Sequence, residues 1–162
     1  MNHTAGNAEN RAAMKELVDN GMPVGVLGYL LDDPVAWCAV APRAAYESIV
    51  RSRTLPIDDP GDETIWAVNC LFIRAGFRQR GLTLPMVEAA VEYARQSGAR
   101  IVEAYPVEIL PGDTSRGTLG TFLDAGFSVY AKDRTTSKRN VVVGRTLRSR
   151  RNQQVRRDRP TR

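Results

Sequence analysis

Residues 73–83 read IRAGFRQRGLT and join the two most regular segments of the chain. Before this junction, residues 64–73 (TIWAVNCLFI) are apolar, aromatic and β-branched, which is typical of a buried central strand. After it, residues 82–97 carry apolar side chains at helical spacing, and Gly98 ends the predicted helix. Residues 101–107 (IVEAYPV) predict the next strand. A strand, a helix and a strand in this order indicate a βαβ unit with parallel pairing.

The segments on either side of this unit predict antiparallel pairs and short helices. Residues 24–31 and 35–40 are apolar runs around a turn-forming Asp-Asp-Pro, and residues 127–131 and 141–147 flank a polar turn. Short helices are expected at residues 10–18, 43–50 and 118–125. Together these elements predict an α+β fold, in which helices flank a mixed, mostly antiparallel sheet with one parallel step.

Composition restricts the class of protein. The 162 residues suffice for one domain, and 43% hydrophobic with 25% charged residues is ordinary for a globular chain. No apolar run approaches the roughly 20 residues that span a bilayer. Residues 1–20 are polar and lack the apolar centre of a signal peptide. We therefore expect a cytoplasmic protein with no membrane partner.

Cysteine and histidine are too few for a metal centre. The chain has two cysteines, Cys38 and Cys70, and one histidine, His3. A zinc site needs about four such ligands at short spacing, so no metal is expected. The same scarcity argues against a histidine-dependent triad, and both cysteines are expected to be core residues.

The net charge of +5 is concentrated at the C-terminal end. Residues 145–162 hold eight arginines and one aspartate, which leaves a small negative charge on the rest of the chain. We expect a single domain over residues 1–147 and a basic, disordered tail over residues 148–162. Such a tail is either solvated or a contact for nucleic acid, and nucleic-acid binding is expected only through it.

The junction at residues 73–83 is suited to an anion. The first N–H groups of a helix have no partner within the helix, and the helix dipole places partial positive charge beside them. Gly81 lets a ligand approach the backbone, and Arg78 and Arg80 add full positive charges. The chain contains no P-loop and no G-x-G-x-x-G fingerprint. The pattern therefore predicts a phosphate or pyrophosphate site of another type.

The same residues resemble a known family motif. Residues 78–83 (RQRGLT) are similar to motif A, R-x-x-G-x-[G/A], of the GNAT N-acetyltransferase superfamily, which follows a strand and opens a helix. Residues 122–127 (FLDAGF) resemble motif B of that family, commonly Y-x-x-x-G-F. The hairpin at residues 24–40 fits the family's early strands, so the resemblance extends over about residues 24–147.

The resemblance implies an acetyl-CoA-dependent N-acetyltransferase that moves the acetyl group to a small-molecule or peptide amine by direct attack, without a metal. Backbone groups of Leu71, Phe72 and Ile73 would bind the acetyl carbonyl and the pantetheine arm, where the two parallel strands part. The pyrophosphate would lie on the N–H groups of motif A, which belong to Arg78, Gln79, Arg80, Gly81, Leu82 and Thr83. Ser115 and Phe122 are the remaining expected cofactor contacts.

Three departures from the family pattern have consequences. Motif B commonly has a tyrosine that protonates the leaving thiolate, and Phe122 cannot; either Tyr105 or Tyr130 serves, or the thiolate leaves unaided. Thr83 replaces the usual Gly or Ala, so its hydroxyl would bond a phosphate or cap the helix. The family's first strand and helix have little room before residues 10–18. A missing first strand would expose a sheet edge, which favours a homodimer or another covering of that edge.

Residues near the predicted site have two interpretations each. Glu103 is either the general base, directly or through water, or a strand residue that faces solvent or a salt bridge. Tyr105 is either the general acid or an aromatic residue packed on the long helix. Trp66 and Asn69 either line the acceptor pocket or belong to the core. A group of acidic residues would attract a cationic amine or simply be solvated: Asp58, Asp59, Asp62 and Glu63.

Two alternatives to an enzyme stay open. A GNAT-like protein can hold acyl-CoA without turnover, which Phe122 and the short front of the chain favour. A nucleic-acid-associated protein would act through the arginine tail instead.

Overall fold

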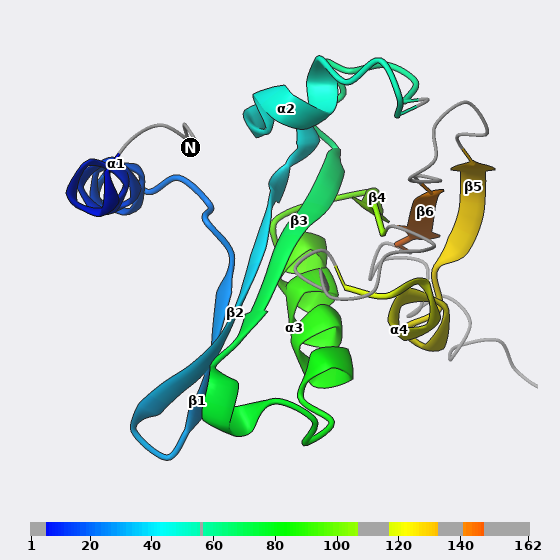
Figure 1. Ribbon diagram of the computed structural model, residues 1–162. Coiled ribbons are helices and arrows are strands. Elements are labelled where there is room, and N and C mark those ends of the chain that lie inside the picture. Colours follow the sequence, from blue (N-terminus) through cyan, green and yellow to red (C-terminus); the bar gives the residue numbers. More distant parts are fainter. Residues whose placement is uncertain (1–5, 56, 107–116, 133–140, 148–162) are drawn as a thin grey trace, which may run out of the picture.

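The computed structural model describes residues 6–55, 57–106, 117–132 and 141–147, and its centre is a six-stranded sheet (Figure 1). The strands are β1 (Val26–Leu30), β2 (Asp33–Pro42), β3 (Ile65–Ile73), β4 (Ile101–Ala104), β5 (Ser128–Lys132) and β6 (Val141–Thr146). The helices are α1 (Asn7–Asp19), α2 (Glu47–Val50), α3 (Thr83–Gln96) and α4 (Leu119–Asp124), with 3-10 turns at Arg43–Ala45 and Ala75–Phe77. In these ranges no helix is both long and apolar enough to cross a membrane.

The parallel step lies in the middle of the sheet, whose strand order is β1-β2-β3-β4-β6-β5. β3 and β4 pair in parallel from Ile65↔Ile101 to Val68↔Ala104, and α3 connects them across one face (Figure 1). The other neighbouring strands are antiparallel. The predicted α+β fold with one βαβ step is therefore confirmed, as are the two predicted antiparallel pairs.

α3 covers one face of the sheet because its apolar residues recur at helical spacing. Its buried side chains are Met86, Val87, Ala90, Val91 and Ala94. They pack on the side chains of β2, β3, β4 and β6 that face the helix, in the larger of two apolar clusters. The opposite face carries a smaller cluster, which consists of Ile49, Leu55, Ala67, Tyr105 and Val142. The two faces of the sheet are therefore unequally covered.

Two elements differ from their predicted bounds. The helix predicted at residues 43–50 is broken at Tyr46, where φ −104° and ψ 84° are not helical, into a 3-10 turn and α2. β4 ends at Ala104 rather than at residue 107. Pro106 has no N–H to give to a ladder, and residue 107 lies outside the described ranges. Ser115 and the tail at residues 148–162 also lie outside them.

The N-terminal helix is longer than the predicted range 10–18 and buries none of its residues. Figure 1 shows α1 apart from the sheet, joined to β1 by an extended segment. β1 forms one edge of the sheet, and no described strand pairs with its outer side. Within the described residues, neither α1 nor the outer side of β1 is therefore covered by another element.

Gly25→Ala is expected to destabilise the fold, because Gly25 lies against the backbone of β2. Its φ is +121°, and a Cβ there would lie 2.1 Å from the Cys38 carbonyl oxygen and 2.9 Å from the Ala39 Cα. Backbone atoms cannot swing aside as a side chain can, so the β1–β2 hairpin must shift. We expect a loss of more than about 2 kcal/mol in the free energy of unfolding, measured by urea denaturation.

Gly61→Ala is the matched control, because a Cβ at Gly61 would meet only an Asp59 carboxylate oxygen at 3.9 Å. It should change the free energy of unfolding by less than about 0.5 kcal/mol. Equal effects of the two substitutions would contradict a special approach of Gly25 to β2.

Candidate cofactor-binding site

The connection between β3 and α3 forms an exposed corner of main chain. After β3 the chain makes the 3-10 turn Ala75–Phe77, and α3 begins at Thr83. Gly81 has φ +75°, and a Cβ there would meet no atom within 4 Å, so the space in front of it is open. Gln79 also has a positive φ, 59°, which is uncommon for a residue with a side chain. This path leaves the backbone at Gly81 open to the approach of a ligand.

Four consecutive backbone N–H groups at this corner have no hydrogen-bond acceptor among the described residues. Within the described part of the chain, the N–H groups of Gln79, Arg80, Gly81 and Leu82 donate to no protein oxygen. Thr83 follows as the first residue of α3, and the first turn of α3 contains no acidic residue. N–H groups at a helix start carry the positive end of the helix dipole. The corner therefore suits a ligand with several negatively charged oxygens.

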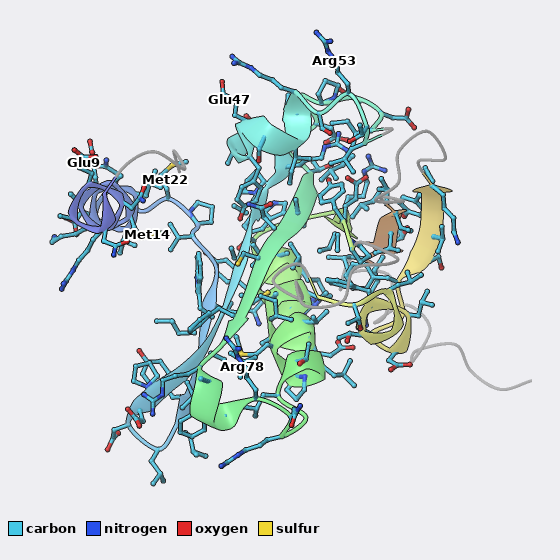
Figure 2. The ribbon with its side chains drawn as sticks, in the orientation of Figure 1. Glu9, Met14, Met22, Glu47, Arg53 and Arg78 are labelled. Carbon is cyan, nitrogen blue, oxygen red and sulfur yellow. The ribbon has the colours of Figure 1, made fainter. Side chains whose placement is uncertain are left out.

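The two arginines predicted at this corner, Arg78 and Arg80, have charges that no described acidic side chain neutralises. Arg78 donates from Nε to the Ile73 carbonyl at 3.0 Å, and Figure 2 shows it beside the lower end of β3. Arg80 lies over the ring of Phe77, 5.4 Å from its centroid. Among the described residues neither arginine has an acidic partner. Arg78 thus also supports the end of β3, while both side chains leave the corner positively charged.

A third arginine, Arg74, was not singled out by the sequence. Its Nη2 lies 2.8 Å from Oδ2 of Asp33 in an exposed ion pair. The hydrogen bond and the charge of Arg74 lower the pKa of Asp33. Arg74 therefore ties the β1–β2 hairpin to the end of β3, and its charge is already matched.

β3 and β4 part before β3 ends. Their pairing stops at Val68↔Ala104, whereas β3 continues to Ile73. On the β4 side, Leu71, Phe72 and Ile73 have no strand partner among the described residues. Backbone N–H and C=O groups along such an edge bond to water, to a ligand or to other parts of the chain. The edge suits an extended ligand that carries its own amide groups.

A β-bulge lies where the strands part. The pairing of β2 with β3 shifts register and leaves Asn69 as an extra residue in β3. Val68 before the bulge and Leu71 after it both face α3, although residues of one face are normally an even number apart. Phe72 consequently points to the opposite face, where it is half exposed. Leu71, Phe72 and Ile73 all lie along the open edge of β3.

Phe122 lies behind this opening, in the core. It is fully buried and packs edge-to-face on Phe127, with 5.2 Å between ring centroids. A Cβ on Gly117 would lie 2.8 Å from the Phe122 ring and 3.8 Å from a Leu71 methyl carbon, so Phe122 stands close to β3. The resemblance implies a cofactor contact for Phe122, and in this structure its ring contacts protein side chains instead.

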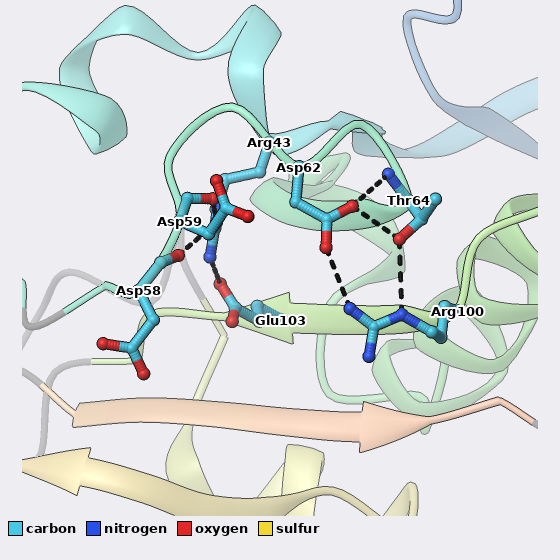
Figure 3. A network of polar contacts seen from close by, with 7 residues as sticks. All are labelled: Arg43, Asp58, Asp59, Asp62, Thr64, Arg100 and Glu103. Atoms are coloured by element: carbon cyan, nitrogen blue, oxygen red, sulfur yellow. Dashed lines mark hydrogen bonds and ion pairs between the residues drawn. The ribbon is translucent and has the colours of Figure 1, made fainter.

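Glu103, the expected general base, belongs to a buried ion pair (Figure 3). Arg43 Nη1 lies 3.0 Å from Glu103 Oε2, and the two side chains are 0% and 8% exposed. The Tyr105 hydroxyl donates to the same oxygen at 2.7 Å. Arg43 Nη2 also donates to the carbonyl oxygens of Asp58, at 2.5 Å, and Asp59. The network ties the loop after α2 to β4.

This arrangement matches the salt-bridge interpretation of Glu103. Both donors use one of its oxygens, and Tyr105 is buried and directed at the carboxylate. Burial, and then the charge of Glu103, raises the pKa of Tyr105 above its ordinary value. Arg43 was missed by the sequence reasoning, because an arginine that follows an apolar strand is ordinarily exposed and nothing in the local pattern marks this one as buried. Its Nε has no hydrogen-bond partner among the described residues.

The acidic loop is partly fixed rather than freely solvated. Asp62 Oδ1 accepts hydrogen bonds from the backbone and hydroxyl of Thr64, and Oδ2 lies 2.8 Å from Arg100 Nη2 (Figure 3). These contacts, the Thr64 hydrogen bonds first, lower the pKa of Asp62. Together with the two carbonyl groups that bind Arg43, they hold the loop at both ends.

Trp66, a candidate for the acceptor pocket, and Cys38, expected in the core, are both buried. Trp66 is buried and packs edge-to-face on Tyr93 of α3, with 5.7 Å between centroids. Burial raises the pKa of the Cys38 thiol to about 12, so this thiol stays protonated near neutral pH.

In the part of the chain that the structure describes, no three His, Cys, Asp or Glu side chains gather as a metal site requires.

Comparison with known proteins gives matches in structure alone. No family model and no curated protein sequence matches the chain. The ribosomal-protein-alanine N-acetyltransferase of Brucella melitensis is 14% identical with a TM-score of 0.60, over 90% of this chain and 82% of that one. A Salmonella typhimurium protein described as an acetyltransferase, solved with acetyl-CoA, is 12% identical with a TM-score of 0.62, over 91% and 78%.

A third solved structure carries the family name. It is a Desulfovibrio desulfuricans protein described as an acetyltransferase of the GNAT family, 16% identical with a TM-score of 0.57, over 89% of this chain and 84% of that one. At sequence identities of 12–16%, these similarities concern the fold alone. The chain therefore has the fold of the GNAT acetyltransferases.

Proposed function

We propose that the chain binds acetyl-CoA and transfers its acetyl group to an amine. The observation that carries this proposal is the row of four unpaired N–H groups before α3, directly beside the open edge of β3. A diphosphate and an extended arm with amide groups are the two parts of coenzyme A that such a surface would bind. The acetyl-CoA in the similar Salmonella structure supports the same ligand.

The cofactor would lie in two stretches. Its pyrophosphate would accept hydrogen bonds from the N–H groups of the corner, which belong to Gln79, Arg80, Gly81 and Leu82, with the charges of Arg78 and Arg80 and the Thr83 hydroxyl close by. Its pantetheine arm would complete the edge of β3 at Leu71, Phe72 and Ile73. The absence of an acidic residue from the first turn of α3 favours this placement.

The bound acetyl-CoA would supply a thioester whose carbonyl carbon a neutral amine attacks. The chain would contribute positioning and main-chain donors toward the carbonyl oxygen; one such donor is typically worth about 10²–10³ in rate. Glu103 already accepts two hydrogen bonds, and Tyr105 is turned toward it. We therefore assign both a positioning role, and we propose that the amine proton passes to water and that the thiolate leaves unaided.

A non-catalytic acyl-CoA-binding protein is the second candidate. It is favoured by the buried Phe122 at the position of the usual motif B tyrosine and by the occupied Glu103. Release of free thiol from acetyl-CoA, measured against a panel of small amines and peptides, separates the two. Thiol release above the protein-free rate supports transfer, and tight coenzyme A binding without release supports the binding protein.

Gly81→Val is expected to weaken coenzyme A binding at least about tenfold, equivalent to about 1.4 kcal/mol. The new side chain would occupy the open space in front of Gly81, and its backbone at φ +75° suits no β-branched residue. Isothermal titration of the purified chain with coenzyme A measures the change.

Gly98→Val provides a matched control at the other end of α3. Gly98 also has a positive φ, +92°, and a Cβ there would also meet no atom within 4 Å. It imposes a similar backbone strain, away from the corner, so the affinity for coenzyme A should be kept. Equal losses in the two variants would count against the pyrophosphate placement.

Glu103→Gln is expected to lower the free energy of unfolding by about 3–5 kcal/mol, because the Arg43 cation stays buried without its counter-ion. For a chain of this length that corresponds to a fall in Tm of roughly 6–20 °C, measured by thermal denaturation. Unchanged stability with a selective loss of thiol release would instead identify Glu103 as the base.

Glu88→Gln is the control for this experiment. Glu88 pairs with Arg145 at 2.9 Å, but both side chains are partly exposed, at 47% and 32%. Such a pair contributes at most about 1 kcal/mol. A similar loss in both variants would show that the burial of the Arg43–Glu103 pair has no special weight.

A further inference from the structure

Exposed apolar side chains follow the edge of the sheet formed by β1, from α1 at one end of this strand to the hairpin turn at the other (Figure 1). The large hydrophobic residues exposed there are Leu17, Val18, Met22, Leu27, Tyr29, Leu30, Leu31 and Phe72. They belong to α1, the segment after it, β1 with its hairpin turn, and the end of β3. The rest of the described surface exposes only Leu84, Leu123, Val129 and Tyr130. Such a concentration marks an interaction surface.

Part of this surface is a row of side chains across three strands. Leu27 pairs with Trp37, and Trp37 pairs with Phe72, and residues paired in this way point to one face of the sheet. The neighbouring Gly28 faces α3, since a Cβ there would lie 2.6 Å from the Met86 sulfur. The row therefore lies on the face opposite α3.

The tip of the β1–β2 hairpin presents a leucine under strain. Leu31 is 93% exposed and has φ +54°, a conformation in which hairpin turns normally place Gly, Asn or Asp. Neither local conformation nor burial within this chain favours a leucine there. A contact outside the chain would explain its presence.

The outer edge of β1 is open and uncharged. No described strand pairs with it, and residues 26–30 (VLGYL) contain no charged side chain. Natural sheets usually protect such edges with lysine, proline or a covering segment. An antiparallel pairing of β1 with a second β1 would therefore bring no like charges together.

We propose that this surface joins two copies of the chain, with β1 pairing antiparallel to the β1 of the second copy. A two-fold axis beside β1 brings both α1 helices toward the interface, because only a short segment separates α1 from β1. A helix of 13 residues that buries none of its side chains has only marginal stability in water. Figure 2 shows Met14 and Met22, which lie on and after this helix, away from the sheet. Asp32 and Asp33 beside the tip disfavour a polyanion as the partner.

The surface is large enough for a stable dimer. Aromatic side chains have about 150–250 Å² each and aliphatic ones less, so the exposed fractions of the eight residues amount to at most roughly 700–1,100 Å² per copy. A standard stable interface buries about 800 Å² on each partner. The available apolar area therefore meets the requirement without any contribution from the other face of the molecule.

Sedimentation velocity on the full chain tests the proposal. The wild type is expected to be a dimer at about 100 µM, and Leu27→Lys should weaken association at least about tenfold. Leu123→Lys is the matched control, since Leu123 is a similarly exposed leucine on α4, and it should leave the dimer intact. A monomeric wild type, which would leave the surface to another partner, or equal effects of the two lysines would overturn the proposal.

Leu31→Asn separates association from folding. Asparagine accepts a positive φ more readily than leucine. In the Leu27→Lys background, Leu31→Asn should therefore leave the monomer as stable as Leu27→Lys alone, or more stable, by thermal denaturation. In the wild-type background the same substitution should weaken the dimer, because it removes the most exposed apolar side chain of the surface. A less stable monomer with unchanged association would contradict a role of Leu31 in the interface.

Discussion

The short parallel contact between β3 and β4 is the constraint on which the rest of the structure depends. Four residue pairs, from Ile65 to Val68 on β3, hold the two halves of the sheet together. Because pairing stops there, the polar backbone groups of the last part of β3 need partners from elsewhere. A βαβ crossover places the start of its helix at the carboxyl end of its first strand. The open edge and the unpaired N–H groups before α3 are therefore neighbours by topology.

A buried ion pair fixes the other side of this region. Arg43 and Glu103 are sixty positions apart, and the guanidinium also holds two carbonyl oxygens of the loop after α2. Removing two charges from water is costly, so the pair adds little stability relative to apolar residues of the same shape. What it does supply is a defined position for that loop against β4, next to the point where the strands part.

Features with a local signal could be predicted, and features that depend on distant contacts could not. The apolar run of β3, the helical spacing of α3 and the Arg-rich approach to Gly81 are all readable within a few residues. The bulge at Asn69 depends on the register with β2, and a single asparagine within an apolar run does not predict that register. The pairing of Arg43 with Glu103 and the burial of Phe122 are tertiary choices, and a residue pattern alone leaves them open. The exposure of α1 is of the same kind, since an amphipathic pattern does not name what covers it.

The extra residue in β3 also bears on how this chain can change over evolutionary time. Because Asn69 shifts the alternation, Leu71 enters the core and Phe72 stays outside it. Loss of one residue at this point would remove the bulge and restore regular pairing, and both side chains would keep their present faces. In a regular strand the same loss would exchange the two faces beyond it. The bulge is therefore the place in β3 where a change of one residue in length leaves the core against α3 intact.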